Sequence, residues 1–224
     1  MKSPHFKIWD NYIQMAFIVN AKMISFGATE DKTVVEGDGW VHTTQTYSHK
    51  KLDRGTCISI VDARESKKLW MMHVAAFAAD DIPAPIYGFD IITSPTKVTG
   101  CFHDLSQTVH DQLLFESDFV SKRTRELPDW AKEIFSSNMI ATALPSDDQI
   151  PQLVEIGLNN LDRYLNFLKK SEKTNDQEVI NHHCSKKSKY CYNQLQNTNS
   201  KNVMVSLGLE KEYVESFKKQ QFPH

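Results

Sequence analysis

Two groups that can exchange protons, an aspartate and a histidine, lie 17 positions apart in stretches with the pattern of β-strands. Asp90 lies in the apolar run 86–92, and His73 lies in the run 69–77. Burial disfavours the charged form of an acid, and a proton donor near neutral pH must keep its proton. We therefore expect Asp90 to donate a proton to a ligand that His73 also faces. The alternative is a structural aspartate that only binds backbone groups.

The elements that position this pair are predicted to form a sheet with helices before and after it. Strand patterns rich in β-branched and aromatic residues occur at 33–47 (a hairpin), 57–61, 69–77, 86–93 and 98–102. Helical spacing of apolar residues, or a polar helical pattern, occurs at 6–23, 151–170, 178–197 and 210–221. Short turns between strands favour antiparallel pairing. The order predicts an α+β protein, a three-layer α/β/α sandwich with a central antiparallel sheet.

Length and composition limit the class of protein. The 224 residues suffice for one sizeable core, so we expect a single domain over residues 1–224 and a monomer. A formal net charge of −2 gives no general attraction for nucleic acid, and no apolar run is long enough to span a membrane. Four cysteines without a secretory pattern and an N-terminus unlike a signal peptide favour the cytoplasm.

A histidine and cysteine cluster suggests a metal or nucleic-acid module as an alternative. His182, His183 and Cys184 precede several lysines and Cys191. Thiols and imidazoles bind zinc, but adjacent histidines with this cysteine spacing do not form a standard structural-zinc pattern. We therefore expect no metal, and we interpret the segment as a solvated helix face.

Three blocks of sequence indicate a family. Pro-Ile-Tyr-Gly-Phe-Asp-Ile-Ile occupies 85–92 and continues to a block at 98–106, Arg-Glu-Leu-Pro-Asp-Trp occupies 125–130, and Tyr-Cys-Tyr-Asn-Gln-Leu-Gln-Asn occupies 190–197. Together they resemble the ferredoxin-dependent bilin reductases, and they are most similar to the phycocyanobilin-forming branch. The resemblance spans residues 57–222 and implies the same three-layer fold, with an open-chain tetrapyrrole between the sheet and the C-terminal helices.

The resemblance also implies a chemistry. The substrate is biliverdin IXα, and electrons come singly from reduced ferredoxin through bilin radicals, with no bound flavin or metal. Asp90 matches the aspartate that protonates the bilin, and His73 matches its partner at the lactam end. Arg125 matches the arginine that pairs with a propionate, which suits the planar fork of a guanidinium. Ferredoxins are acidic, so a docking surface could include Lys67, Lys68, Lys186, Lys187, Lys189 and Lys201.

Two departures from the family pattern bear on the product. Val61 occupies the position of a glutamate that, in phycocyanobilin-forming members, protonates the exovinyl group, and the adjacent Asp62 should face the other side of its strand. Thr198 replaces an aspartate, and we expect Thr198 and the neutral Asn197 and Asn199 beside it to contact the pigment. We therefore expect reduction of biliverdin to phycoerythrobilin through 15,16-dihydrobiliverdin. The alternatives are a phycocyanobilin-forming enzyme that uses Asp62 and a non-catalytic bilin-binding protein.

Overall fold

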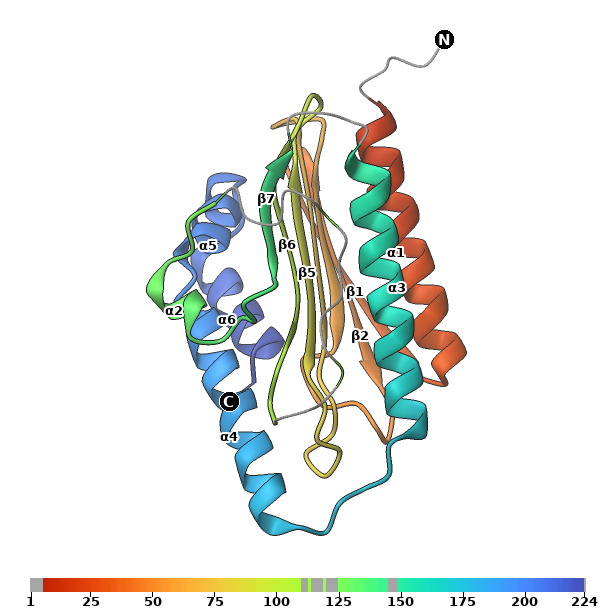
Figure 1. Cartoon of the computed structure of the whole chain (residues 1–224). Helices are drawn as coiled ribbons and strands as arrows, with labels where there is room; N and C mark the ends of the chain where they lie inside the picture. Colours follow the sequence, from red (N-terminus) through yellow and green to blue (C-terminus); the bar gives the residue numbers. More distant parts are fainter. Residues whose placement is uncertain (1–5, 110–112, 114–118, 120–124, 145–148, 224) are drawn as a thin grey trace.

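The computed structural model describes residues 6–109, 113, 119, 125–144 and 149–223, and within them seven strands form one sheet (Figure 1). Each strand pairs antiparallel with the strand that follows it in sequence. The strands are β1 (Thr29–Gly37), β2 (Trp40–Ser48), β3 (Cys57–Ala63), β4 (Leu69–Ala76), β5 (Ile86–Thr93), β6 (Val98–Ser106) and β7 (Ile140–Leu144). The sheet is a simple meander, as the short turns predict.

Helices cover both faces of the sheet (Figure 1). They are α1 (Phe6–Phe26), α2 (Asp129–Lys132), α3 (Gln149–Lys170), α4 (Gln177–Leu195), α5 (Thr198–Ser206) and α6 (Lys211–Gln221). Helices α1 and α3 lie together on one face, and α2, α4, α5 and α6 lie on the other. The predicted three-layer sandwich is thus confirmed. In the described part of the chain, none of the helices combines the length and apolar character needed to cross a membrane.

The face under α1 and α3 holds the largest apolar cluster. Gly157 of α3 allows this close packing, because a Cβ there would lie 2.8 Å from side-chain atoms of both Met15 and Phe89. Side chains alternate along β5, so Phe89 points into this cluster while its neighbour Asp90 points to the opposite face. The dense packing on one face leaves the other face of β5 for a pocket.

The C-terminal helices differ from the sequence prediction at one point. The helix predicted over 178–197 is observed as α4, which ends at Leu195, and a further helix, α5, starts at Thr198. Asn197 separates them with extended backbone angles, and its side-chain oxygen accepts a hydrogen bond from the Asn199 backbone N–H at 3.1 Å. Strand β7 and helix α5 were not predicted, since both are short and lack a strong periodic pattern.

A buried lysine of α4 binds groups in the connections that follow β2 and β4. The Lys187 ammonium donates to Asp80 Oδ1 at 2.7 Å, to the Ala78 carbonyl at 2.9 Å and to Asp53 Oδ2. Its side chain is only 8% exposed. The prediction that Lys187 belongs to an exposed docking surface is therefore wrong, because its charge is already paired inside the fold.

Candidate active site

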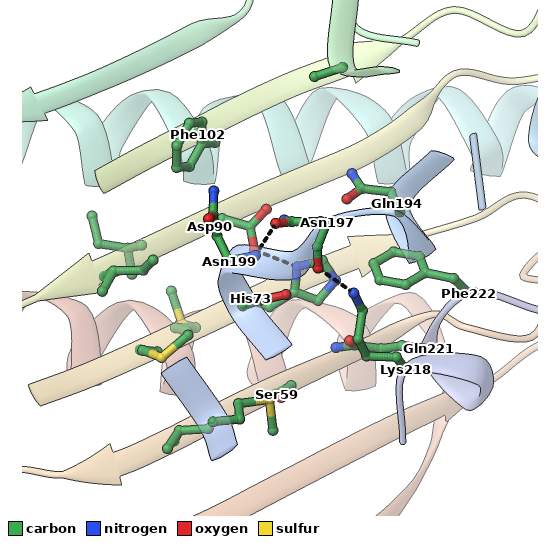
Figure 2. A pocket seen from close by; sticks show the side chains of 18 of the residues that line it. Ser59, His73, Asp90, Phe102, Gln194, Asn197, Asn199, Lys218, Gln221 and Phe222 are labelled. Carbon is green, nitrogen blue, oxygen red and sulfur yellow. Dashed lines mark hydrogen bonds and ion pairs between the residues drawn. The ribbon is translucent and has the colours of Figure 1, made fainter. Parts of the chain in front are cut away.

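A pocket lies between the sheet and the C-terminal helices, on the face opposite α1 and α3 (Figure 2). Strands β3 to β6 form its floor, the 125–135 segment forms one wall, and residues from α4 to the C-terminal end form the other. Its volume is about 180 Å³, or about 1140 Å³ with the open space at its mouth. The enclosed volume is below the roughly 300–1,000 Å³ typical of sites for organic ligands, and the open mouth of the pocket provides further space.

His73 and Asp90 lie side by side on the floor of the pocket (Figure 2). They are directly opposite each other on β4 and β5, so their side chains share one face. His73 Nδ1 and Asp90 Oδ1 are 2.5 Å apart and share one hydrogen bond. Ser59 on β3 lies opposite His73, and Phe102 on β6 lies opposite Asp90, so the four residues form a row across the sheet. The sheet thus brings together the two residues that the sequence separates by 17 positions.

The second ring nitrogen of His73 points to a ligand role. Within the described residues, His73 Nε2 is buried and has no hydrogen-bond partner. The Phe222 ring packs edge-on against the imidazole, with ring centroids 5.6 Å apart, and this contact limits how the histidine can turn. A buried polar atom without a partner is unfavourable, so a lactam oxygen or nitrogen in the pocket would offset that cost.

Asp90 is less buried than its apolar strand suggests. Its side chain is 37% exposed, because the buried residues of β5 face α1 and α3 while Asp90 faces the pocket. The expectation of an acid enclosed by apolar residues is therefore wrong for the pocket as it stands. A ligand seated on the strand would itself remove water from the carboxyl group.

The wall formed by residues 125–135 carries Arg125. Its guanidinium lies over the Phe102 ring at 6.0 Å and donates a hydrogen bond to the Thr99 carbonyl. The buried Asp104 carboxylate holds the end of this wall, because it accepts hydrogen bonds from the Ser136 backbone N–H at 2.8 Å and from its hydroxyl at 2.5 Å. Burial raises the pKa of Asp104, although these hydrogen bonds oppose the shift.

The opposite wall contains the turn between α4 and α5. Asn197 and Asn199 both line the pocket, in agreement with their predicted placement. Thr198 is exposed and lies outside the pocket, so the prediction that it contacts a pigment is not supported by its position.

The segment 182–191 was interpreted from sequence as a solvated helix face, and this interpretation is wrong for His183, Lys187 and Cys191, which are buried. His183 is buried, and its Nδ1 shares a hydrogen bond of 2.7 Å with Thr108 Oγ1. Among the residues that the structure describes, no group of three or more His, Cys, Asp or Glu side chains is placed to hold a metal ion.

Comparison with known proteins places this geometry in a family. The sequence profile of the ferredoxin-dependent bilin reductases matches residues 25–220. The chain belongs to this family. A phycocyanobilin:ferredoxin oxidoreductase from Prochlorococcus marinus is 26% identical over 166 residues, which cover 69% of this chain and 66% of that protein. The chain thus aligns with slightly less than two thirds of this relative.

Two solved structures share the bilin reductase fold. The crystal structure of phytochromobilin synthase from tomato in complex with biliverdin has a TM-score of 0.74 at 15% identity, with coverage of 94% of this chain and 83% of that chain. The structure of PcyX has a TM-score of 0.61 at 23% identity, with coverage of 92% and 94%. The resemblance inferred from the sequence blocks is therefore confirmed at the level of family and fold.

This bilin reductase differs from the family pattern on β3. Val61 lines the pocket, whereas Asp62 lies on the other side of the strand and pairs with Arg64 at 2.7 Å. The pairing of β3 with both neighbours runs without a bulge through this region. Asp62 therefore points away from the pocket, and no acid from β3 replaces the missing glutamate.

Ser59 also lines the pocket, and the sequence did not single it out. Its hydroxyl is held by His42 Nε2 at 2.9 Å, while His42 Nδ1 contacts the Tyr213 hydroxyl at 2.9 Å. Burial lowers the pKa of His42 to about 4, so this imidazole is neutral near pH 7. No local pattern on β2 or β3 indicates the His42–Tyr213 contact, because it depends on the packing of α6 against the sheet.

Lys218 is the most consequential pocket residue that the sequence analysis missed. It lies on the buried face of α6, and its ammonium donates to the Asn197 carbonyl at 2.6 Å. Only 6% of the residue is exposed. A signal was present, since Val214, Phe217 and Gln221 form the buried stripe of this helix and Lys218 lies within it.

Proposed function

We propose that this protein reduces biliverdin IXα to phycoerythrobilin through 15,16-dihydrobiliverdin, with electrons supplied singly by reduced ferredoxin. The observation that carries the proposal is the His73–Asp90 pair, joined at 2.5 Å on the floor of a pocket. Family membership and the biliverdin in the related tomato structure support the choice of substrate. Biliverdin accepts the electrons itself, so the proposed reaction uses no bound flavin or metal.

Proton placement is the part of the reaction that this chain performs. Each reduction adds two electrons and two protons to one conjugated unit, first at the 15,16 bridge and then at the ring-A diene. Asp90 supplies a proton to the bilin, and His73 holds a lactam end through Nε2 while sharing that proton through Nδ1. Asn197 and Asn199 orient the pigment from the opposite wall. Alternating electron and proton addition passes through bilin radicals.

The choice of phycoerythrobilin rests on which acids face the pocket. Formation of phycocyanobilin requires reduction of the exovinyl group, which is not part of the ring-A diene, and this reduction needs a proton donor near that group. Val61 cannot donate, and Asp62 is held on the other side of β3 by Arg64. Reduction of the 15,16 bridge is therefore the favoured first step.

Product analysis tests this assignment. Biliverdin, ferredoxin and a ferredoxin reductase with its reductant should give transient 15,16-dihydrobiliverdin and then phycoerythrobilin, identified by chromatography and absorbance. A product with a reduced exovinyl group and an intact 15,16 bridge would contradict the proposal and would identify the protein as a phycocyanobilin-forming enzyme. Tight binding without any reduction would identify a bilin carrier instead.

Arg125 is predicted to anchor a propionate. Its guanidinium is exposed beside the pocket and, among the described residues, contacts the Phe102 ring and the Thr99 carbonyl, so its charge can meet a carboxylate there. Arg125→Gln should weaken biliverdin binding about tenfold, equivalent to about 1.4 kcal/mol. Absorbance titration measures the effect. The affinity for the dimethyl ester of biliverdin should change little in this variant, because the ester has no carboxylate to pair with Arg125. Arg64→Gln, on the other side of the sheet, should bind biliverdin as tightly as wild type. Equal losses for acid and ester would contradict this role.

The partner and setting follow from the same proposal. Ferredoxin would dock through exposed lysines such as Lys67, Lys68, Lys186 and Lys189, and such an encounter is weak and weakened further by salt. We also propose a monomer in a reducing compartment, the cytoplasm. The four cysteines support the latter, because Cys57, Cys101, Cys184 and Cys191 are all free thiols.

A further inference from the structure

The pocket has few groups that could supply the protons of two successive reductions. Of the described residues that line it, four are titratable: His73, Asp90, Arg125 and Lys218. A guanidinium does not release its proton in a protein, so Arg125 can bind but cannot act as an acid. His73 and Asp90 are one hydrogen-bonded unit. Lys218 is the remaining acid of this set.

The surroundings of Lys218 suit a proton donor. Its ammonium donates to the backbone carbonyls of Asn197 at 2.6 Å and Leu195 at 3.4 Å, and no carboxylate contact accompanies these bonds in the described residues. Burial lowers the pKa of Lys218 to about 8, and the nearby charge of Lys201 on α5 adds to the shift. A donor works best when its pKa is near the working pH. Among charged groups of the sheet, His73 and Asp90 face the same pocket.

The two cations of the pocket lie at different ends of it. Arg125 is exposed and lies over the Phe102 ring. Figure 2 shows Phe102 and Lys218 on opposite sides of the His73–Asp90 pair, with Lys218 near Phe222. The two propionates of biliverdin IXα sit on its middle rings and flank the same bridge. A coiled pigment with its propionates at the exposed Arg125 therefore directs its terminal rings inward, toward His73 and Lys218.

We propose that Lys218 is a catalytic acid for the second reduction, in which it protonates the ring-A diene of 15,16-dihydrobiliverdin. This inference rests on the proposed function. In the step, ferredoxin supplies two electrons one at a time, and two C–H bonds form at the ends of the diene. One proton leaves Lys218 Nζ, and the other comes from the His73–Asp90 unit. The neutral amine and the pair then regain protons from solvent.

The test supplies 15,16-dihydrobiliverdin directly, with reduced ferredoxin, and compares variants of the full chain. Lys218→Arg keeps the charge but cannot release a proton, and Lys218→Met removes both charge and proton. Both should slow phycoerythrobilin formation by about 10²–10⁴-fold while biliverdin is still converted to 15,16-dihydrobiliverdin. Lys219→Met, an exposed neighbour on α6, is the matched control and should resemble wild type. Thermal unfolding of each variant checks the fold.

The pH dependence separates a chemical role from a structural one. In wild type the rate of the second reduction should fall about tenfold per pH unit above about pH 8, since only the ammonium form of Lys218 donates a proton. The rate of the first reduction should not show this fall. An unimpaired second reduction in Lys218→Arg would overturn the proposal, because charge alone would then suffice. Equal slowing of both reductions would also overturn it. Wild-type protein that leaves biliverdin unreduced would refute the proposed function itself, whereas wild-type activity with unaffected Lys218 variants would refute only this inference.

Discussion

Asp90→Asn should bind biliverdin with nearly wild-type affinity and reduce it about 10²–10⁴-fold more slowly. Asparagine has the size of aspartate and can still bond to His73, so the floor of the pocket keeps its shape. It has no proton to release near neutral pH, so the pigment can take up an electron without the proton that normally follows. Anaerobic mixing with reduced ferredoxin, followed by absorbance, measures both the loss of rate and the bilin radical that should accumulate.

Asp62→Asn is the matched control for this experiment. Asp62 lies on the other side of β3, where it pairs with Arg64, so its loss should leave both the rate and the product unchanged. If Asp90→Asn reduced biliverdin at the wild-type rate, the role of Asp90 as proton donor would be ruled out. If Asp62→Asn instead changed the product, the orientation argument for β3 would be wrong.

The second large effect concerns stability. Lys187→Met should lower the free energy of unfolding by about 2–3 kcal/mol, because it leaves Asp53 and Asp80 without their cation and the Ala78 carbonyl without its donor. Loss of one partner of a fully buried pair costs about 3–5 kcal/mol. The expected cost is smaller here because the Asp80 side chain is 64% exposed and water can solvate it.

Denaturant unfolding of Lys187→Met and of Lys189→Met provides the comparison. Lys189 lies on the exposed side of α4 and pairs with Glu133 at 3.0 Å, so its loss should cost much less than the loss of Lys187. If the two variants lost similar amounts of unfolding free energy, the burial of Lys187 would not contribute to stability.

The pH dependence of this contact has a definite sign. The hydrogen bond from Lys187 lowers the pKa of Asp80 below its usual value of 3.8. The stabilisation is therefore complete above about pH 4 and is lost as the pH falls through the lowered pKa. The gap between wild type and Lys187→Met should be constant from pH 5 to 7 and should shrink in acid.

Strand alternation explains why some of the site was predictable. Side chains two apart share a face, so the orientation of Asp62 away from Val61 followed from their adjacency alone. The contact between Asp90 and His73 depends on one further fact, the register of β4 against β5. The short connections of a meander made the pairing of these two strands a sound expectation. Single-domain organisation and the monomeric state remain predictions.

Contacts between distant segments explain what was not predictable. Lys187 looks like an ordinary lysine of a polar helix in the sequence, and only the apolar stripe of the last helix marks Lys218, yet both are buried. Their environment is set by which side of each helix meets the sheet, and that depends on groups more than 20 positions away, such as Asp80 and the Asn197 carbonyl. The exposure of Asp90 was likewise decided by which face of β5 the N-terminal layer covers.

Periodicity and short turns were enough to predict the order of helices and strands and the proximity of Asp90 to His73, and three blocks of residues indicated the family by resemblance. Neither signal could show that Thr198 faces solvent, that Lys187 is an internal ion-pair partner or that Lys218 reaches the pocket. These placements result from long-range packing, in which helices α4 to α6 must bury one face against strands formed much earlier in the chain.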